Sequence, residues 1–185
     1  MINRSFVVLA LAAIFAAAAS QLHGQALPSA KATGVLQAGI GLTIAQGDEF
    51  TERLGGLTGY ATLDFSRHLG AEVDIHILNL ITPYNFVENT YLGGARYAWH
   101  KGRFTPYVKV LGGLGQTYIK QPSTTYAQGT PSSTFAFAGG GGLDIRLPFH
   151  INVRAIDFEY QMWPGYVPNG LSPTLLTCGA AYRFQ

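Results

Sequence analysis

The stretch "TGVLQAGIGLTIA", residues 33–45, alternates between apolar and polar or small side chains at every second position. One set of alternate residues is aliphatic and consists of Leu36, Ala38, Ile40, Leu42 and Ile44. The other set is polar or small and consists of Gln37, Gly39, Gly41 and Thr43. Because successive side chains of a β-strand point to opposite faces, this spacing predicts a strand with one apolar and one polar face.

The same alternation recurs in later segments of about ten residues each. These segments span about residues 57–66, 71–79, 90–99, 106–118, 135–146, 151–163 and 173–184. We therefore expect an all-β chain of eight strands. After residue 27 there is no apolar run of 18 residues, so the sequence predicts no membrane-spanning helix.

The links between these segments alternate in length. Short links cover 67–70, 100–104 and 147–150, and longer links rich in Gly, Pro, Asn, Ser and Thr cover 46–56, 80–89, 119–134 and 164–172. In an up-and-down antiparallel order, all short links lie on one side and all long links on the other. This arrangement is typical of a transmembrane β-barrel with short periplasmic turns and longer outer loops.

Aromatic residues on the apolar face support the barrel. Those expected near the long links are Tyr91, Tyr118, Phe135 and Tyr160, and those expected near the short links are Phe65, Trp99, Phe149, Tyr182 and Phe184. Outward positions between the two groups are small, as at Ala61, Ala95 and Gly139. Two aromatic girdles around an aliphatic or small middle are characteristic of barrels in lipid.

The start of the chain and its composition fit an exported membrane protein. Residues 1–26 combine a short basic start, an apolar run and small residues, which predicts a signal peptide cleaved after Ser20 or Ala26. Residues 27–185 then form one barrel domain. Only 12% of the residues are charged, against roughly 25% in a typical soluble domain.

The single cysteine excludes an internal disulfide, and a net charge of +2 without a basic block argues against nucleic acid as a partner.

An eight-stranded barrel is just wide enough for side chains to fill it, so its inward charges must pair. The alternation places eight charged residues in such a network: Glu72, Asp74, Arg96, Lys109, Asp144, Arg154, Asp157 and Glu159. In 151–163, strict alternation would send either Arg154 or Asp157 outward. We therefore predict a β-bulge near Ala155–Ile156 that keeps both charges inside.

The final stretch "LLTCGAAYRFQ" resembles the last strand of small eight-stranded bacterial outer-membrane barrels, the superfamily of the outer membrane protein A transmembrane domain. In that family an alternating last strand ending in an aromatic residue is recognised by the barrel-assembly machinery. The resemblance implies this role for Tyr182 and Phe184, although here Phe184 is followed by one more residue, Gln185. It further implies contact with outer-membrane lipid and lipopolysaccharide, and we expect a monomer.

The expected function is non-enzymatic: a barrel with a filled lumen that serves envelope structure or surface interaction through its outer loops. Three alternatives remain open: an exported lipocalin-like barrel that binds an apolar ligand, a narrow ion or water conduit, and a lipid A-modifying enzyme. We identify no catalytic residues and expect no cofactor, because no Gly-x-Ser-x-Gly motif or phosphate-binding loop occurs. One cysteine and scattered histidines give no metal-ligand spacing along the chain.

Overall fold

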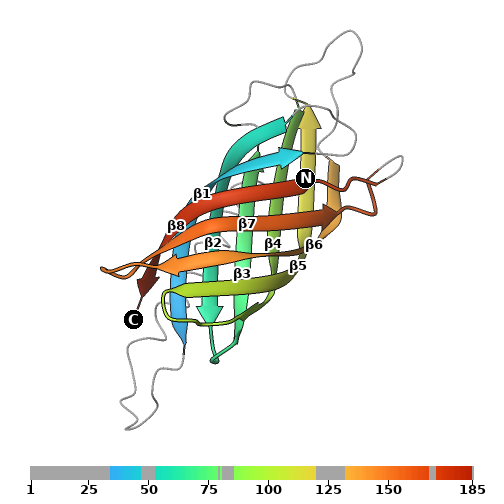
Figure 1. Cartoon of the computed structure of the whole chain (residues 1–185). Coiled ribbons are helices and arrows are strands. Elements are labelled where there is room, and N and C mark those ends of the chain that lie inside the picture. The colour runs from blue at the N-terminus through green and yellow to red at the C-terminus, as the bar shows by residue number, and fades with distance from the viewer. Residues whose placement is uncertain are drawn as a thin grey trace, which may run out of the picture. The chain divides into compact units, whose positions relative to one another are not determined.

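Eight antiparallel strands pair in chain order, and the first closes onto the last to form a barrel (Figure 1). The strands are β1 (Val35–Gln46), β2 (Arg53–Asp64), β3 (Leu69–Leu78), β4 (Phe86–Ala98), β5 (Phe104–Ile119), β6 (Ser132–Arg146), β7 (Ile151–Met162) and β8 (Thr174–Phe184). The computed structural model describes residues 34–46, 53–78, 80, 86–119, 132–166 and 170–184. The predicted signal peptide and most of the predicted outer loops lie outside these residues. Among the described residues, no helix is long and apolar enough to cross a membrane.

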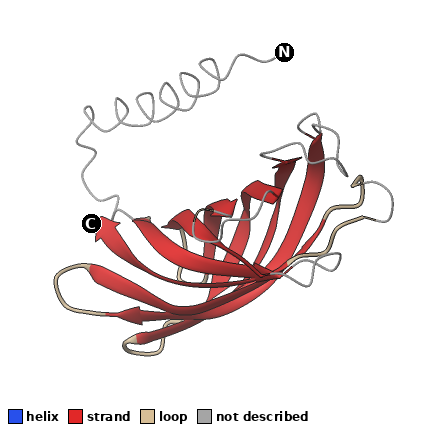
Figure 2. Ribbon diagram, turned by 90° about the horizontal axis from the view of Figure 1, so that it is seen from above, coloured by secondary structure: helices blue, strands red, loops and turns tan. Residues whose placement is uncertain are grey.

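The predicted eight-stranded fold is confirmed, and some strands, notably β2 and β4, are longer than expected at the ends near the long links. β2 begins at Arg53 and β4 at Phe86, each four residues before the predicted start. The ladders explain these extensions, because Gln46 pairs with Arg53 and Phe86 pairs with Ile119. Some residues whose composition is typical of a loop are therefore part of a strand, because they pair with residues of the neighbouring strand. Figure 2 shows the strands curving around a common interior.

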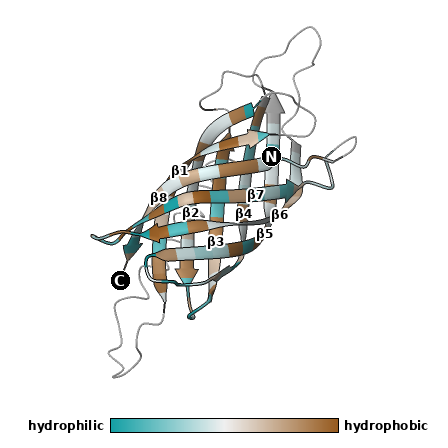
Figure 3. Ribbon diagram, viewed as in Figure 1, coloured by the Kyte–Doolittle hydropathy of each residue, from teal (hydrophilic) through white to brown (hydrophobic). Residues whose placement is uncertain are grey.

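The two faces of the wall are sorted as the alternation predicts. Outward positions carry aliphatic and aromatic side chains, whose exposed fractions include 61% at Ile40, 70% at Val110 and 50% at Tyr182. Inward positions carry the charged residues, and all eight of the predicted network have exposed fractions of 5% or less. Figure 3 shows hydrophobic and hydrophilic residues alternating along the strands. The apolar surface of this barrel is thus on its outside.

The predicted aromatic positions can be checked at most sites. Tyr91, Phe135 and Tyr160 are exposed in the halves of their strands that adjoin the long links, while Trp99 and Phe149 follow the opposite strand ends. The side chain of Tyr118 lies outside the described residues. Two girdles therefore frame the outer wall, as barrels in a bilayer require.

The predicted β-bulge lies at Ala155–Ile156. In the ladder with β6, Ile156 pairs with Leu143 and Arg154 with Asp144, so Ala155 has no partner. The ladder with β8 shifts at the same place, between Arg154 and Asp157. The carbonyl oxygen of Ala155 accepts a bond from the thiol of Cys178 at 3.1 Å. One extra residue thus returns the strand to phase, so Arg154 and Asp157 both point inward.

Two inward glycines make room for large rings. A Cβ atom at Gly115 would collide with the ring of Trp163, and one at Gly142 would collide with the ring and hydroxyl of Tyr107. This pairing of an absent side chain with a large one lets both rings fit inside the narrow lumen. The outward Gly139 differs, because a Cβ atom there would meet nothing within 4 Å. Within this glycine-rich run, the missing side chain therefore relieves crowding at Gly142 but not at Gly139.

Deleting Ala155 should leave a folded barrel, because the residues on either side already pair consecutively with Leu143 and Asp144. Deleting Phe158 should instead prevent folding. Asp157 would then precede Glu159 directly, so one of the two carboxylates would leave the lumen, and breaking a buried ion pair costs about 3–5 kcal/mol. The measurement is the fraction of refolded protein whose mobility on SDS gels shifts on heating. Equal damage from the two deletions would contradict the bulge assignment.

Candidate functional site

The structure brings the eight charged residues of the expected network together inside the barrel. They come from five consecutive strands: Glu72 and Asp74 from β3, Arg96 from β4, Lys109 from β5, Asp144 from β6, and Arg154, Asp157 and Glu159 from β7. Where a strand contributes more than one, the residues are two apart, except that the bulge in β7 separates Arg154 from Asp157. The network therefore links β3 to β7 through side chains, in addition to the backbone ladders.

Lys109 lies at the centre of this network. Its Nζ atom is 2.6 Å from Asp74 Oδ2, 2.7 Å from Asp157 Oδ2, 3.0 Å from Glu159 Oε2 and 3.3 Å from Glu72 Oε1. One compact ammonium group thus contacts four carboxylates from β3 and β7. Since buried charges need partners of opposite sign, the ammonium of Lys109 offsets part of the repulsion among these four carboxylates.

Two arginines occupy the part of the network nearer the short turns. Arg154 binds both carboxylate oxygens of Glu72, with Nη1–Oε1 and Nη2–Oε2 distances of 2.9 and 3.1 Å. Arg96 donates from Nη2 to Asp144 Oδ2 at 2.6 Å. The guanidinium of Arg154 lies 3.8 Å above the ring of Tyr60, and that of Arg96 lies 4.0 Å above the ring of Tyr107. Planar guanidinium groups suit both the paired carboxylate bonds and the stacking.

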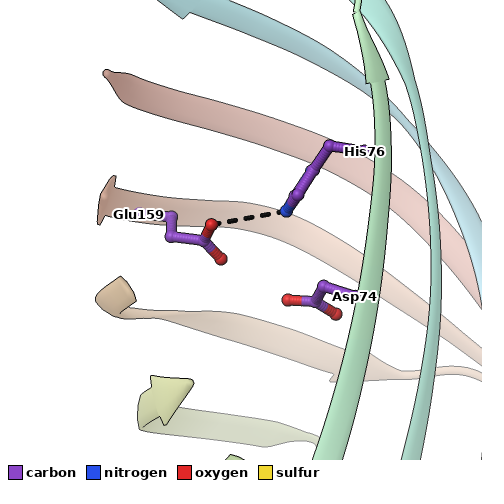
Figure 4. Close-up of side chains that lie close together, drawn as sticks. All are labelled: Asp74, His76 and Glu159. Atoms are coloured by element: carbon purple, nitrogen blue, oxygen red, sulfur yellow. Dashed lines mark ion pairs between the residues drawn. The ribbon is translucent and has the colours of Figure 1, made fainter. Parts of the chain in front are cut away.

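A second polar layer lies between Lys109 and the long-link end. His76 Nδ1 is 2.7 Å from the hydroxyl of Thr58, which is itself bonded to the hydroxyl of Thr43. On its other side, His76 Nε2 is 3.3 Å from Glu159 Oε1 (Figure 4). The same Glu159 oxygen accepts a bond from Gln161 Nε2 at 2.6 Å. Glu159 therefore joins the lysine-centred group to this histidine and threonine layer.

The lumen becomes apolar toward the long links. One buried cluster contains Leu92, Leu111, Ala136, Ala138, Trp163 and Leu171, and a second contains Ala45, Leu54, Leu78 and Leu175. The indole nitrogen of Trp163 donates to Gln161 Oε1 at 2.9 Å, which connects the apolar and polar layers. Buried side chains of the described strands thus line the interior from the ion pairs toward this end.

The sequence analysis missed several of these interior residues. The sequence pattern predicts Glu88 in a loop, but it is a buried residue of β4 with an exposed fraction of 2%. Its spacing from Thr90 and Leu92 continues the inward alternation, and this signal was available in the sequence. By contrast, the positions of Tyr107 and Trp163 beside inward glycines depend on the pairing of strands and have no signal along the chain.

The histidines do not form a hydrolytic site among the described residues. His68, His100 and His150 lie in the short turns between strands, and the ring nitrogens of His68 and His100 contact the carbonyl oxygens of Ala98 and Arg67. His76 is buried within the lumen, with acids and threonines as neighbours. Tyr182 and Phe184 lie at the end of β8 with outward, exposed side chains.

Replacing Lys109 with Met should destabilise the barrel strongly. The substitution removes the ammonium but keeps an unbranched side chain, so four buried carboxylates lose a shared partner, and we expect a loss of about 3–5 kcal/mol. Lys101→Met, in an exposed turn, is the matched control and should change stability by less than about 0.5 kcal/mol.

The measurement is the urea midpoint of each refolded variant in lipid vesicles. Adding Asp74→Asn to Lys109→Met should recover part of the loss, because it removes one of the unpaired charges. A Lys109→Met protein as stable as the Lys101→Met control would contradict the central role of the ammonium.

The comparisons with known proteins agree with this architecture. The family described as "Outer membrane protein beta-barrel domain" matches residues 6–184. Curated proteins give no match. Neisserial surface protein A superposes with a TM-score of 0.65 at 13% identity, covering 82% of this chain and 97% of that one.

Two further solved structures have the same fold. The outer membrane protein OprG from Pseudomonas aeruginosa gives a TM-score of 0.57 at 14% identity, covering 84% of this chain and 97% of that one. Ail, the attachment invasion locus protein of Yersinia pestis, gives 0.53 at 16% identity, covering 82% and 97%. The family match over most of the chain, together with the closed antiparallel barrel, shows that this protein belongs to the outer membrane protein beta-barrel domain family of the bacterial outer membrane.

Proposed function

We propose that this protein is a non-enzymatic outer-membrane barrel with a plugged lumen, which serves envelope structure or surface interaction through its outer loops. The observation that carries the plug is the buried network: Lys109, Arg96 and Arg154 each have an exposed fraction of 2% or less. Aqueous channels belong to barrels of about sixteen strands, whereas eight strands leave an interior that side chains can fill.

The sorting of the two faces argues against the lipocalin-like alternative. A lipocalin holds its ligand in an apolar interior and carries its charges outside. Here the charged network is buried in the lumen, and most of the large apolar residues are exposed on the outer wall. The membrane family and this orientation both support a membrane barrel over a soluble ligand carrier.

The partners we propose follow from the two surfaces. The outward aliphatic and aromatic side chains fit outer-membrane lipid and lipopolysaccharide, and the exposed Tyr182 and Phe184 at the end of β8 fit recognition by the barrel-assembly machinery. A surface role is supported by the length of the links at one end of the barrel. The name of one structural neighbour, the attachment invasion locus protein, describes such a role in that protein.

The competing function is a narrow conduit in which the ion pairs exchange partners. In planar bilayers, the plug predicts no steady conductance from the parent protein, because Lys109 and Arg96 are each held by carboxylates on other strands. A conduit predicts parent conductance that changes with Lys109→Ala or Arg96→Ala but not with Lys101→Ala. Steady conductance from the parent protein would contradict the plug, and its dependence on Lys109 and Arg96 would favour the conduit.

A further inference from the structure

The interior network carries more acidic than basic groups among the described residues. Its five carboxylates are Glu72, Asp74, Asp144, Asp157 and Glu159, and its three cations are Arg96, Lys109 and Arg154. Within these eight residues, five negative charges less three positive charges leave two negative charges when His76 is neutral, and the buried Glu88, which is outside the eight, adds to this excess when it is ionised. Because an uncompensated buried charge is costly, this excess points to a further positive charge in the same space.

Three side chains next to Lys109 converge on one point. One ring nitrogen of His76 and one carboxylate oxygen each of Asp74 and Glu159 all lie within 4.8 Å of one another, and Figure 4 shows the three side chains pointing toward one another. The distance of 3.3 Å between His76 Nε2 and Glu159 Oε1 is long for a hydrogen bond. It equals the separation of about 3.3 Å expected for two ligands bound tetrahedrally to zinc at 2.0–2.1 Å.

The surroundings hold these side chains in an orientation suited to a metal. The Thr58 hydroxyl lies 2.7 Å from Nδ1 of His76. When Nδ1–H donates to this hydroxyl, the lone pair of Nε2 is left facing Glu159. Ligating histidines typically donate their other ring N–H to such a partner, which fixes the tautomer and the ring. Gln161 orients Glu159 Oε1 in the same way, at 2.6 Å.

Among the described residues, several buried carboxylate oxygens inside the barrel have no hydrogen-bond partner, including one of Asp74 and one of Glu88. Asp74 Oδ1 is unpartnered, although Asp74 is fully buried and its other oxygen binds Lys109. Glu88 Oε1 is also unpartnered, and the carboxylate of Glu88 interacts electrostatically with His76. Since buried polar atoms are normally paired, the unpartnered oxygen of Asp74 is one that a cation bound between these three side chains would partner.

We propose that Asp74, His76 and Glu159 bind one divalent transition-metal ion of the zinc class inside the barrel. Asp74 and Glu159 would each bind the metal through one oxygen and keep Lys109 on the other, so the ammonium stays in place. The dication offsets the two excess negative charges. It also ties β3 to β7, independently of whether the lumen is a plug or a conduit.

The test is zinc binding to the refolded, EDTA-treated full-length barrel in detergent micelles. A Cys178→Ser background removes the exposed thiol as a competing ligand. Isothermal titration with zinc chloride should give one equivalent per barrel. His76→Gln and Asp74→Asn should each weaken binding at least tenfold, whereas His100→Gln, in an exposed turn, should leave it unchanged.

Two further measurements test the proposal even if a variant of a metal-binding residue folds poorly. Thr58→Val keeps every ligand but removes the hydroxyl beside His76, and should weaken zinc binding about 10- to 100-fold. Co²⁺ bound to the Cys178→Ser protein should give the visible absorption of a tetrahedral site. Absence of a zinc equivalent in that protein, or an affinity that none of the three variants lowers, would overturn the proposal.

Discussion

The constraint on which this structure depends is that a charged side chain has no acceptable place on the outer wall of a barrel in lipid. Outward Arg or Lys costs roughly 2–4 kcal/mol at the middle of a bilayer. Strict alternation satisfies this constraint on β1 and β3 without irregularity. On β7 it does so only with the bulge at Ala155–Ile156, so one additional residue decides whether Arg154 and Asp157 are on the same side.

Charges that cannot face outward must be accommodated within a narrow interior. The structure does so by sharing: Lys109 contacts four carboxylates, and Glu72 contacts Lys109, Arg96 and Arg154. Such shared contacts make the interior cooperative, since the removal of one member leaves several others unpaired. Beyond the ion pairs, His76, Thr58 and Thr43 form a hydrogen-bonded layer that Glu159 joins to the network. The apolar clusters lie toward the long links.

The sequence predicts the number of strands, their faces and the bulge, because each depends on the period-2 pattern of residues near one another in the chain. It also predicts which charges are inward. It does not predict their partners, because Arg154 meets Glu72 only once β3 and β7 face each other across the lumen. The convergence of His76 and Glu159 has the same origin, which is why spacing along the chain shows no metal-ligand pattern. Glu88 was missed for a different reason: its strand extends into a segment whose composition is typical of a loop.

The two tryptophans provide the most direct test of the inside-out sorting of the wall. Trp99 is exposed on the outer face with an exposed fraction of 38%, and Trp163 is buried in the lumen at 1%. The measurement is fluorescence quenching by brominated lipids of the single-tryptophan variants Trp163→Phe and Trp99→Phe, refolded into vesicles. The orientation described here predicts strong quenching of Trp99 and much weaker quenching of Trp163. Equal quenching of the two, or stronger quenching of Trp163, would contradict it.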